Sequence, residues 1–249
     1  MSEDSVPATR VETSGSQGSL AGRIVLIAGA TSASGEAVAR ALVARGATVL
    51  AVGTSRERLD SLAEAVPGVD VRVCDLADHS AVTELAMRIH VKFARIDGLV
   101  HLVGGWRGGG GITGQSDDDW AFLERSFATL RNTSRVFYDD LVASPAGRLA
   151  VVSSTAVDRP YPGGANYAAA KAAADAWTRA ISKGFAADAP DAAAAIFVVK
   201  SLAGLEDELA SRVAALWDEA PSTINGVRQL LTASEGGTNQ PTDPARIER

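Results

Sequence analysis

The stretch that decides the fold runs from residue 24 to residue 42 and reads IVLIAGATSASGEAVARAL. Its first five residues are all apolar and predict a buried strand, and the Ala-rich segment from Gly35 onward predicts a helix. The seven residues between them, Gly29-Ala30-Thr31-Ser32-Ala33-Ser34-Gly35, are small. Small residues let backbone N–H groups approach a pyrophosphate at the positive end of the helix. Similar turns also occur in proteins that bind no ligand, but this one lies where a dinucleotide fingerprint must lie.

The rest of the chain repeats this alternation of apolar runs and Ala-rich helical patterns. Each apolar run is nearly continuous, which is typical of strands covered by helices on both faces. Strands are predicted at 24–28, 48–52, 69–74, 98–103, 148–153, 194–199 and 227–231, and helices at 35–45, 56–65, 79–93, 118–143, 165–186 and 206–217. The pattern predicts an α/β fold with a single Rossmann-type, doubly wound parallel sheet of about seven strands.

The length and composition fit one such domain. The chain has 249 residues, of which 46% are hydrophobic and 22% charged. Residues 1–20 and 234–249 are polar and rich in Ser, Thr, Gly or Pro, which predicts two flexible tails around a domain at 21–233. No apolar leader follows Met1, and no run approaches the roughly 18 apolar residues of a membrane span. We therefore expect a cytoplasmic protein with no membrane partner.

Charge and cysteine content exclude several function classes. With 24 basic and 30 acidic side chains, the net charge is −6, which gives no electrostatic basis for binding nucleic acid. Cys74 is the only cysteine, and the three histidines are scattered. No intrachain disulfide can form, and no metal site is expected.

The end of the second predicted strand bears on the choice of nucleotide. It reads Gly53-Thr54-Ser55-Arg56, at the place where an acidic residue would bind the ribose 2′-hydroxyl of NAD. Two hydroxyls and a guanidinium suit a 2′-phosphate instead, so NADP is favoured over NAD. The alternative is that Arg56 is a solvated residue in the first turn of a helix. Asp75 and Leu76, at the end of the third strand, either contact adenine or form a turn.

A second group of polar residues follows the fifth predicted strand. Tyr167 and Lys171 are four residues apart on a predicted helix, so they lie on one face of it. A nearby cation favours the phenolate form of a tyrosine and brings its proton within reach of catalysis at neutral pH. Ser154, thirteen residues before Tyr167, would project from the carboxyl edge of the sheet and polarise the same carbonyl oxygen. The pair can also arise by chance on a helix surface.

Together, the glycine loop, the serine and the Tyr-x-x-x-Lys motif resemble the short-chain dehydrogenase/reductase family over residues 22–232. The resemblance implies an oxidoreductase that moves hydride between a nicotinamide cofactor and a carbonyl or alcohol. It implies that Tyr167 is the general acid or base, that Lys171 lowers its pKa and holds the ribose, and that Ser154 orients the substrate oxygen. The expected cofactor-binding residues are Gly29, Thr31, Ser32, Ser34, Gly35, Thr54, Ser55, Arg56, Asp75, Leu76, Gly104, Tyr167 and Lys171.

The chain departs from that family pattern at several positions. Ala33 replaces the middle glycine of the loop, Phe127 replaces an asparagine of the proton relay, and Lys200-Ser201-Leu202 replaces a Pro-Gly pair. The segment Gly104-Gly105-Trp106-Arg107-Gly108-Gly109 resembles part of the dihydropteridine reductase branch. We predict that Phe127 packs without a chemical role. His101 is interpreted as a packing residue or a base, and Lys200 as a ligand for a phosphate or carboxylate or as a solvated side chain.

These departures keep a second function open: a catalytically impaired nucleotide-binding protein that acts as a binding or structural partner. The retained Ser154, Tyr167 and Lys171 favour the enzyme. Family members commonly associate through the two helices predicted here at 118–143 and 165–186, so a homodimer or homotetramer is expected.

Overall fold

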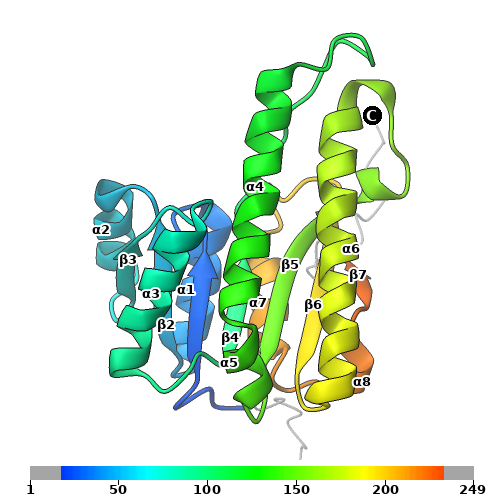
Figure 1. Cartoon of the computed structure of the whole chain (residues 1–249). Coiled ribbons are helices and arrows are strands. Elements are labelled where there is room, and N and C mark those ends of the chain that lie inside the picture. Colours follow the sequence, from blue (N-terminus) through cyan, green and yellow to red (C-terminus); the bar gives the residue numbers. More distant parts are fainter. Residues whose placement is uncertain (1–17, 233–249) are drawn as a thin grey trace, which may run out of the picture.

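A computed structural model describes residues 18–232 and contains a parallel sheet of seven strands in the order β3-β2-β1-β4-β5-β6-β7 (Figure 1). The strands are β1 (Ile24–Ala28), β2 (Thr48–Gly53), β3 (Asp70–Val73), β4 (Gly98–His101), β5 (Arg148–Ser154), β6 (Ala193–Val199) and β7 (Arg228–Leu230). The predicted doubly wound parallel sheet is confirmed. The strands are added in one direction from β1 to β3 and in the opposite direction from β4 to β7, so the strand order switches between β1 and β4. Ligands bind at such a switch point in open α/β sheets.

Two hydrophobic cores lie on the two faces of the sheet. One packs the sheet against α1 (Ala33–Ala44), α2 (Arg56–Ala65), α7 (Glu206–Ala215) and α8 (Pro221–Ile224). The other packs it against α3 (His79–Lys92), α4 (Asp117–Val136), α5 (Tyr138–Ala143) and α6 (Ala165–Asp188). Because both faces are covered, the strands tolerate the nearly continuous apolar runs from which they were predicted.

The helix predicted at 118–143 is two helices, α4 and α5, that meet at Phe137. Backbone hydrogen bonds continue through the junction: the Phe137 N–H donates to Thr133, and the Leu141 N–H donates to Phe137. The junction is therefore a bend, and the Phe137 ring lies fully buried in the core beside it. The short helix α8 was not predicted; Pro221 occupies its first turn, where a missing N–H costs nothing.

Side chains at the helix starts explain where the helices begin. Ser32 caps α1, Ser55 caps α2 and Asp78 caps α3 through bonds to backbone N–H groups. At the start of α4 the Ser116 hydroxyl accepts the Asp119 N–H at 3.1 Å.

The predicted tails lie almost entirely outside the described residues. Within the described part, Leu20 is buried and its N–H donates to the Arg45 carbonyl. None of the helices between residues 18 and 232 has the length and hydropathy to cross a membrane.

The N-terminal parts of α4 and α6 extend past the carboxyl edge of the sheet (Figure 1). The residues predicted to be functional are therefore placed above the carboxyl ends of the central strands.

Candidate active site

Two glycines allow the loop after β1 to pack tightly. Gly29 has φ +82°, and a Cβ there would lie 3.0 Å from the backbone of Leu102 and Val103. A Cβ on Gly35 would lie 2.4 Å from the Ala30 carbonyl oxygen. Both positions exclude other side chains, so the loop backbone stays against the sheet and leaves space above it.

The start of α1 offers free backbone donors to an anion. The Ser32 hydroxyl accepts the Gly35 N–H at 3.0 Å. The N–H groups of Ala33 and Ser34 have no acceptor within the described chain. Unpaired N–H groups at the positive end of a helix suit a phosphate group. Ala33 therefore keeps the donor that the loop needs, although it adds a methyl group.

Three cavities that share wall residues run along the carboxyl edge of the sheet. The loop cavity, of about 380 Å³, has the Gly29 loop in its wall. The central cavity, of about 500 Å³, shares Ser32 and Gly104 with it. The outer cavity, of about 830 Å³, shares Tyr167 and Lys200 with the central one. Together they give room for an elongated ligand that runs from the second strand to Tyr167.

Most of the predicted cofactor-binding residues line these cavities. The loop cavity is lined by Gly29, Thr31, Ser32, Thr54, Asp75, Leu76 and Gly104 from the predicted set. The central cavity is lined by Ser32, Ser34, Gly104, Tyr167 and Lys171 from the same set. Gly35 supports the loop from beneath, as described above.

Two residues at the start of α2 do not lie as predicted. Arg56 is 63% exposed and pairs with Asp60 one turn on, and it does not line the loop cavity. The Ser55 hydroxyl caps α2 by accepting the Arg58 N–H at 3.3 Å, and Ser55 does not line the loop cavity. Arg58 lines the cavity instead. Two residues along a helix is a rotation of about 200°, so the two arginines point in different directions.

The loop cavity also contains a cation that the sequence did not indicate. Arg125 reaches in from α4, and its guanidinium lies 2.5 Å from the carboxylate of Asp75. The other Asp75 oxygen accepts the Ala77 N–H at 3.0 Å. Asp75 thus forms a turn and also lines the cavity, so the two interpretations of this residue are compatible.

Ser154 and Tyr167 meet in the wall of the outer cavity. Ser154 ends β5, and its oxygen accepts the Ala156 N–H at 3.1 Å, which leaves its O–H free to donate. Burial raises the pKa of Tyr167 above its usual value, while a hydrogen bond with Ser154 lowers it. Burial has the larger effect, so the pKa of the phenol lies above its usual value near 10 and the group is protonated at neutral pH.

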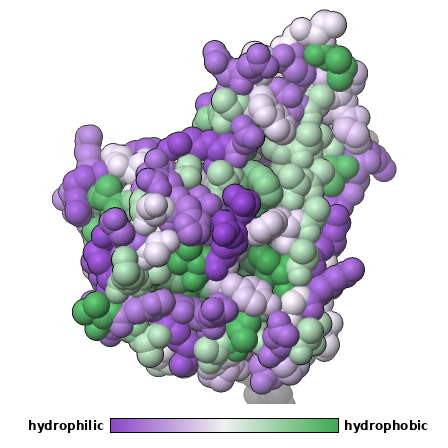
Figure 2. Space-filling view, viewed as in Figure 1, coloured by the Kyte–Doolittle hydropathy of each residue, from purple (hydrophilic) through white to green (hydrophobic). Residues whose placement is uncertain are grey.

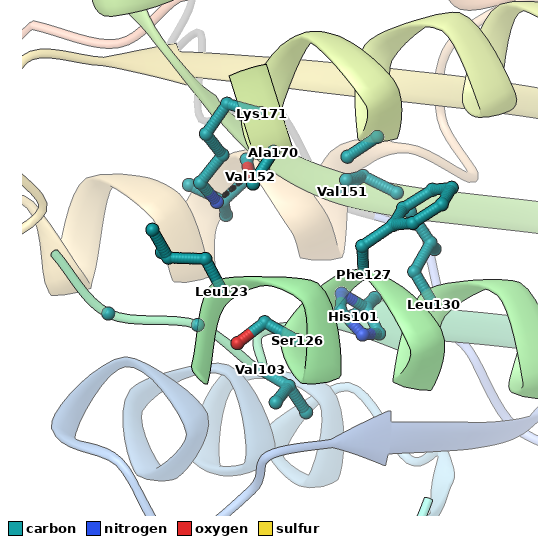
Figure 3. Close-up of a pocket in the computed structure, with 13 residues that line it drawn as sticks. His101, Val103, Leu123, Ser126, Phe127, Leu130, Val151, Val152, Ala170 and Lys171 are labelled. Atoms are coloured by element: carbon teal, nitrogen blue, oxygen red, sulfur yellow. Dashed lines mark hydrogen bonds between the residues drawn. The ribbon is translucent and has the colours of Figure 1, made fainter. Parts of the chain in front are cut away.

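Lys171 lies one turn from Tyr167 on α6, as predicted. Its ammonium donates to the Val152 carbonyl at 2.8 Å (Figure 3). It lies 5.9 Å from the centre of the Tyr167 ring. Burial lowers the pKa of Lys171 to about 8, against an opposing effect of Asp175. The lowering of the Tyr167 pKa by Lys171 stays a prediction.

A small buried pocket separates Lys171 from α4, and Phe127 forms part of its wall (Figure 3). The Phe127 ring packs edge-on against Trp177, with 6.2 Å between ring centres. The side chain therefore packs, as predicted. It offers no polar atom to Lys171, so α4 supplies no amide here to a proton relay.

His101 lies at the end of β4 in the same pocket and is a hydrogen-bonded packing residue. Its Nε2 is 2.8 Å from the Thr129 hydroxyl, which itself donates to the Ser126 carbonyl, so Nε2 carries the proton in this network. Burial and the nearby Lys171 lower the pKa of His101 to about 3. The ring is thus neutral at physiological pH.

This lowered pKa predicts a pH-dependent stability. The unfolded chain binds a proton at His101 near pH 6.5 and the folded chain only near pH 3, so acid favours unfolding. Between pH 6.5 and 5 we expect the free energy of unfolding to fall by about 1.5–2 kcal/mol more in the wild type than in His101→Gln. Denaturant titrations at both pH values measure the difference, and parallel changes in the two proteins would contradict the assignment.

An ion-pair network that the sequence analysis missed lies beneath Ser154. Arg228 on β7 lies 2.9 Å from the fully buried Asp175 carboxylate, pairs with Asp158, and donates to the Ser154 carbonyl at 3.3 Å. The contact with Asp175 is not aligned as a hydrogen bond, so charge attraction alone stabilises that pair. One signal was present in the sequence: Asp175 is a lone carboxylate in an Ala-rich helix, one turn beyond Lys171.

The chemistry of these residues fits a nicotinamide dinucleotide. Free N–H groups at α1 suit its pyrophosphate, the loop cavity suits its adenosine half, and Tyr167 and Lys171 face the central cavity. A parallel sheet with such a site at its switch point defines a dinucleotide-binding α/β protein.

The sequence of the chain places it in a particular family. A family profile described as short chain dehydrogenase matches residues 23–189. A relative from Thermotoga maritima, named 3-oxoacyl-[acyl-carrier-protein] reductase, is 33% identical over 169 residues, which cover 66% of this chain and 68% of that protein. The chain belongs to the short-chain dehydrogenase family of oxidoreductases, which use a nicotinamide cofactor.

Solved structures support the fold. A metagenomic short-chain oxidoreductase in complex with NADP aligns with a TM-score of 0.74 at 23% identity, covering 85% of this chain and 99% of that one. An NAD⁺-bound xylitol dehydrogenase aligns with a TM-score of 0.74 at 19% identity, covering 85% and 98%. The two contain different nucleotides, so the likeness of fold does not choose between them.

Proposed function

We propose that the chain transfers hydride between a nicotinamide cofactor and a carbonyl or alcohol substrate, with Ser154, Tyr167 and Lys171 as its catalytic residues. The observation that carries the proposal is that Tyr167 lines two adjoining cavities. It lies in the wall of both the central and the outer cavity, so it stands where a nucleotide and a second molecule would meet.

The residues divide the reaction between them. A bound reduced nicotinamide would supply hydride to the carbonyl carbon. Tyr167, whose phenol is protonated at neutral pH, donates a proton to the carbonyl oxygen. The free O–H of Ser154 donates a hydrogen bond to that oxygen and stabilises its developing charge. Lys171 faces the central cavity and would hold hydroxyl groups of the cofactor ribose there.

The test is a titration of the purified chain with NADPH and NADH, followed by a panel of aldehydes and ketones. Oxidation of the nucleotide that depends on the carbonyl is the expected result. Nucleotide binding without turnover on any carbonyl would favour the second function, a nucleotide-binding partner. Phe127 supports that second function, because it removes a polar group next to Lys171.

We further propose that NADP is preferred to NAD, and that Arg58 with Thr54 contacts the 2′-phosphate. Both residues line the loop cavity, and neither is acidic. Arg58→Ala should weaken NADPH binding about 10-fold or more, as expected for a lost charge-assisted contact, and leave NADH binding unchanged. Arg56→Ala is the matched control, since Arg56 lies outside the cavity. Equal effects of the two substitutions on NADPH would reject Arg58 as the contact.

The remaining expectations concern assembly and location. We propose a homodimer or homotetramer that forms through α4 and α6. Figure 2 shows a pale-green strip along α6, where Ala169, Ala176 and Ala180 are exposed. Small side chains permit close packing of helices from two copies. The domain limits of 21–233 and the cytoplasmic location stay predictions.

A further inference from the structure

The outer cavity carries an excess of positive charge that the reaction proposed above does not use. Its charged wall residues are three cations, Arg159, Lys200 and Arg228, and one anion, Asp158. The protein as a whole has a net charge of −6, so this concentration of cations does not follow from composition. It is local to the cavity whose inner wall holds Ser154 and Tyr167.

One of these cations is fixed in place. Arg228 is anchored by the buried Asp175 beneath it and by the Ser154 carbonyl, and it pairs with Asp158 at the cavity wall. Its charge is therefore largely balanced by these two carboxylates. Arg228 stabilises the wall next to Ser154. Because Arg228 pairs with Asp158, the acidic residue of this wall, Asp158 is not free to neutralise the other cations.

Arg159 and Lys200 are the cations without partners. Neither side chain has a hydrogen bond or ion pair with any residue from 18 to 232, and both are exposed. Arg159 lines the outer cavity but not the central one, whereas Lys200 lines both. Arg159 is thus placed to contact the second molecule, and Lys200 stands between that molecule and the nucleotide.

Apart from Ser154 and Thr155, the uncharged residues of the wall are apolar or aromatic. Trp106 and Tyr161 are 54% and 48% exposed, and Leu230 is 64% exposed, so their surfaces are open to a ligand. Apolar surface suits the carbon skeleton of a substrate, and the two unpaired cations suit an anionic group attached to it. A fixed anion also orients the carbonyl toward Tyr167, which reduces the entropy lost on reaching the reactive geometry.

We propose that the substrate of this site carries an anionic group, a carboxylate or a phosphate, that binds Arg159 and Lys200 while its carbonyl faces Tyr167 and Ser154. This inference rests on the proposed function, because it gives the substrate class of the same site. It adds a requirement that hydride transfer alone does not impose: removing the charge of the substrate should lower kcat/KM for that substrate.

The experiment compares matched pairs of carbonyl compounds that differ in charge. The pairs are 4-carboxybenzaldehyde with its methyl ester, and glyceraldehyde 3-phosphate with glyceraldehyde. We expect kcat/KM to be about 10-fold or more higher for at least one charged member than for its neutral partner. The pair that shows the preference distinguishes carboxylate from phosphate. Added salt should reduce that preference, because it screens charges at exposed sites.

Variants then assign the preference to residues. Arg159→Gln and Lys200→Gln should each lower kcat/KM for the charged compound several-fold, and the double variant should remove the preference for the charged compound over its neutral partner. Lys183→Gln is the matched control, because Lys183 is exposed on α6 and lines none of the three cavities. Equal use of charged and neutral compounds by the wild type would overturn the inference and leave the proposed function intact.

Calorimetric binding of the same compounds in the presence of NADP⁺ separates the two proposals. Binding of a charged member that is lost in the double variant, without turnover of any carbonyl, would support the anion site and reject the oxidoreductase. Failure of both charged members to bind at millimolar concentration would reject the anion site.

Discussion

Tyr167→Phe is expected to reduce kcat by about 10²–10⁴-fold, the usual contribution of a general acid, and to leave the affinity for NADPH nearly unchanged. The substitution removes one hydroxyl and keeps the ring, so the packing of α6 is preserved. The phenol lies where the central and outer cavities meet and is protonated at neutral pH, so in the proposed mechanism its loss removes the proton source for the carbonyl oxygen. Steady-state kinetics with an identified carbonyl and a separate NADPH titration measure the two effects.

Tyr138→Phe provides the control for this substitution. Tyr138 stacks on Phe185, and its hydroxyl lies 3.5 Å from Asp188, in no contact with the three cavities. The same chemical change there should leave kcat within about a factor of two. If Tyr167→Phe retained the activity of the wild type, the mechanism would fail and the nucleotide-binding alternative would gain support.

The sheet could be predicted from the sequence because each strand is a short apolar run between helical patterns. That signal is local, and burial on both faces makes it strong. The bend at Phe137 could not be predicted in the same way. The residues on both sides of it continue the helical pattern, and the bend depends on a ring that packs into a core formed by distant residues.

In the candidate site, too, some residues could be predicted from a local sequence signal and others depend on the three-dimensional fold. Ser154, Tyr167 and Lys171 belong to a motif with fixed spacing, so sequence alone could nominate them. The choice between Arg56 and Arg58 depends on how α2 is rotated against the sheet, which spacing does not determine. Arg125 pairs with Asp75, which lies 50 residues earlier in the chain. Arg228 pairs with Asp158, which lies 70 residues earlier. Only the three-dimensional fold brings these pairs together.

Arg228→Met is expected to give the largest loss of stability. Asp175 is fully buried, and its closest cation is Arg228, at 2.9 Å. Removing one partner of a buried ion pair leaves an uncompensated charge, which costs about 3–5 kcal/mol. Because 23% of the Arg228 side chain is exposed, we expect a loss of about 3 kcal/mol in the free energy of unfolding, measured by denaturant titration.

Two further variants test whether the loss comes from the stranded carboxylate. The double variant Arg228→Met with Asp175→Leu should recover most of the stability, because it leaves no buried charge. Arg212→Met is the matched control: Arg212 is 40% exposed and lies 4.0 Å from Glu219, so its loss should cost under about 1 kcal/mol. If the double variant were as unstable as Arg228→Met alone, the cost would lie in lost packing and not in charge.

The same carboxylate also acts on Lys171, one of the proposed catalytic residues. Asp175 raises the pKa of Lys171, which burial lowers to about 8. In Asp175→Asn the protonated ammonium loses a stabilising charge, so its pKa falls further. If the proposed reaction needs protonated Lys171, activity should decline above about pH 8 in the wild type and begin to decline at lower pH in Asp175→Asn. An unchanged alkaline limb in the variant would show that Asp175 stabilises the fold without tuning the lysine.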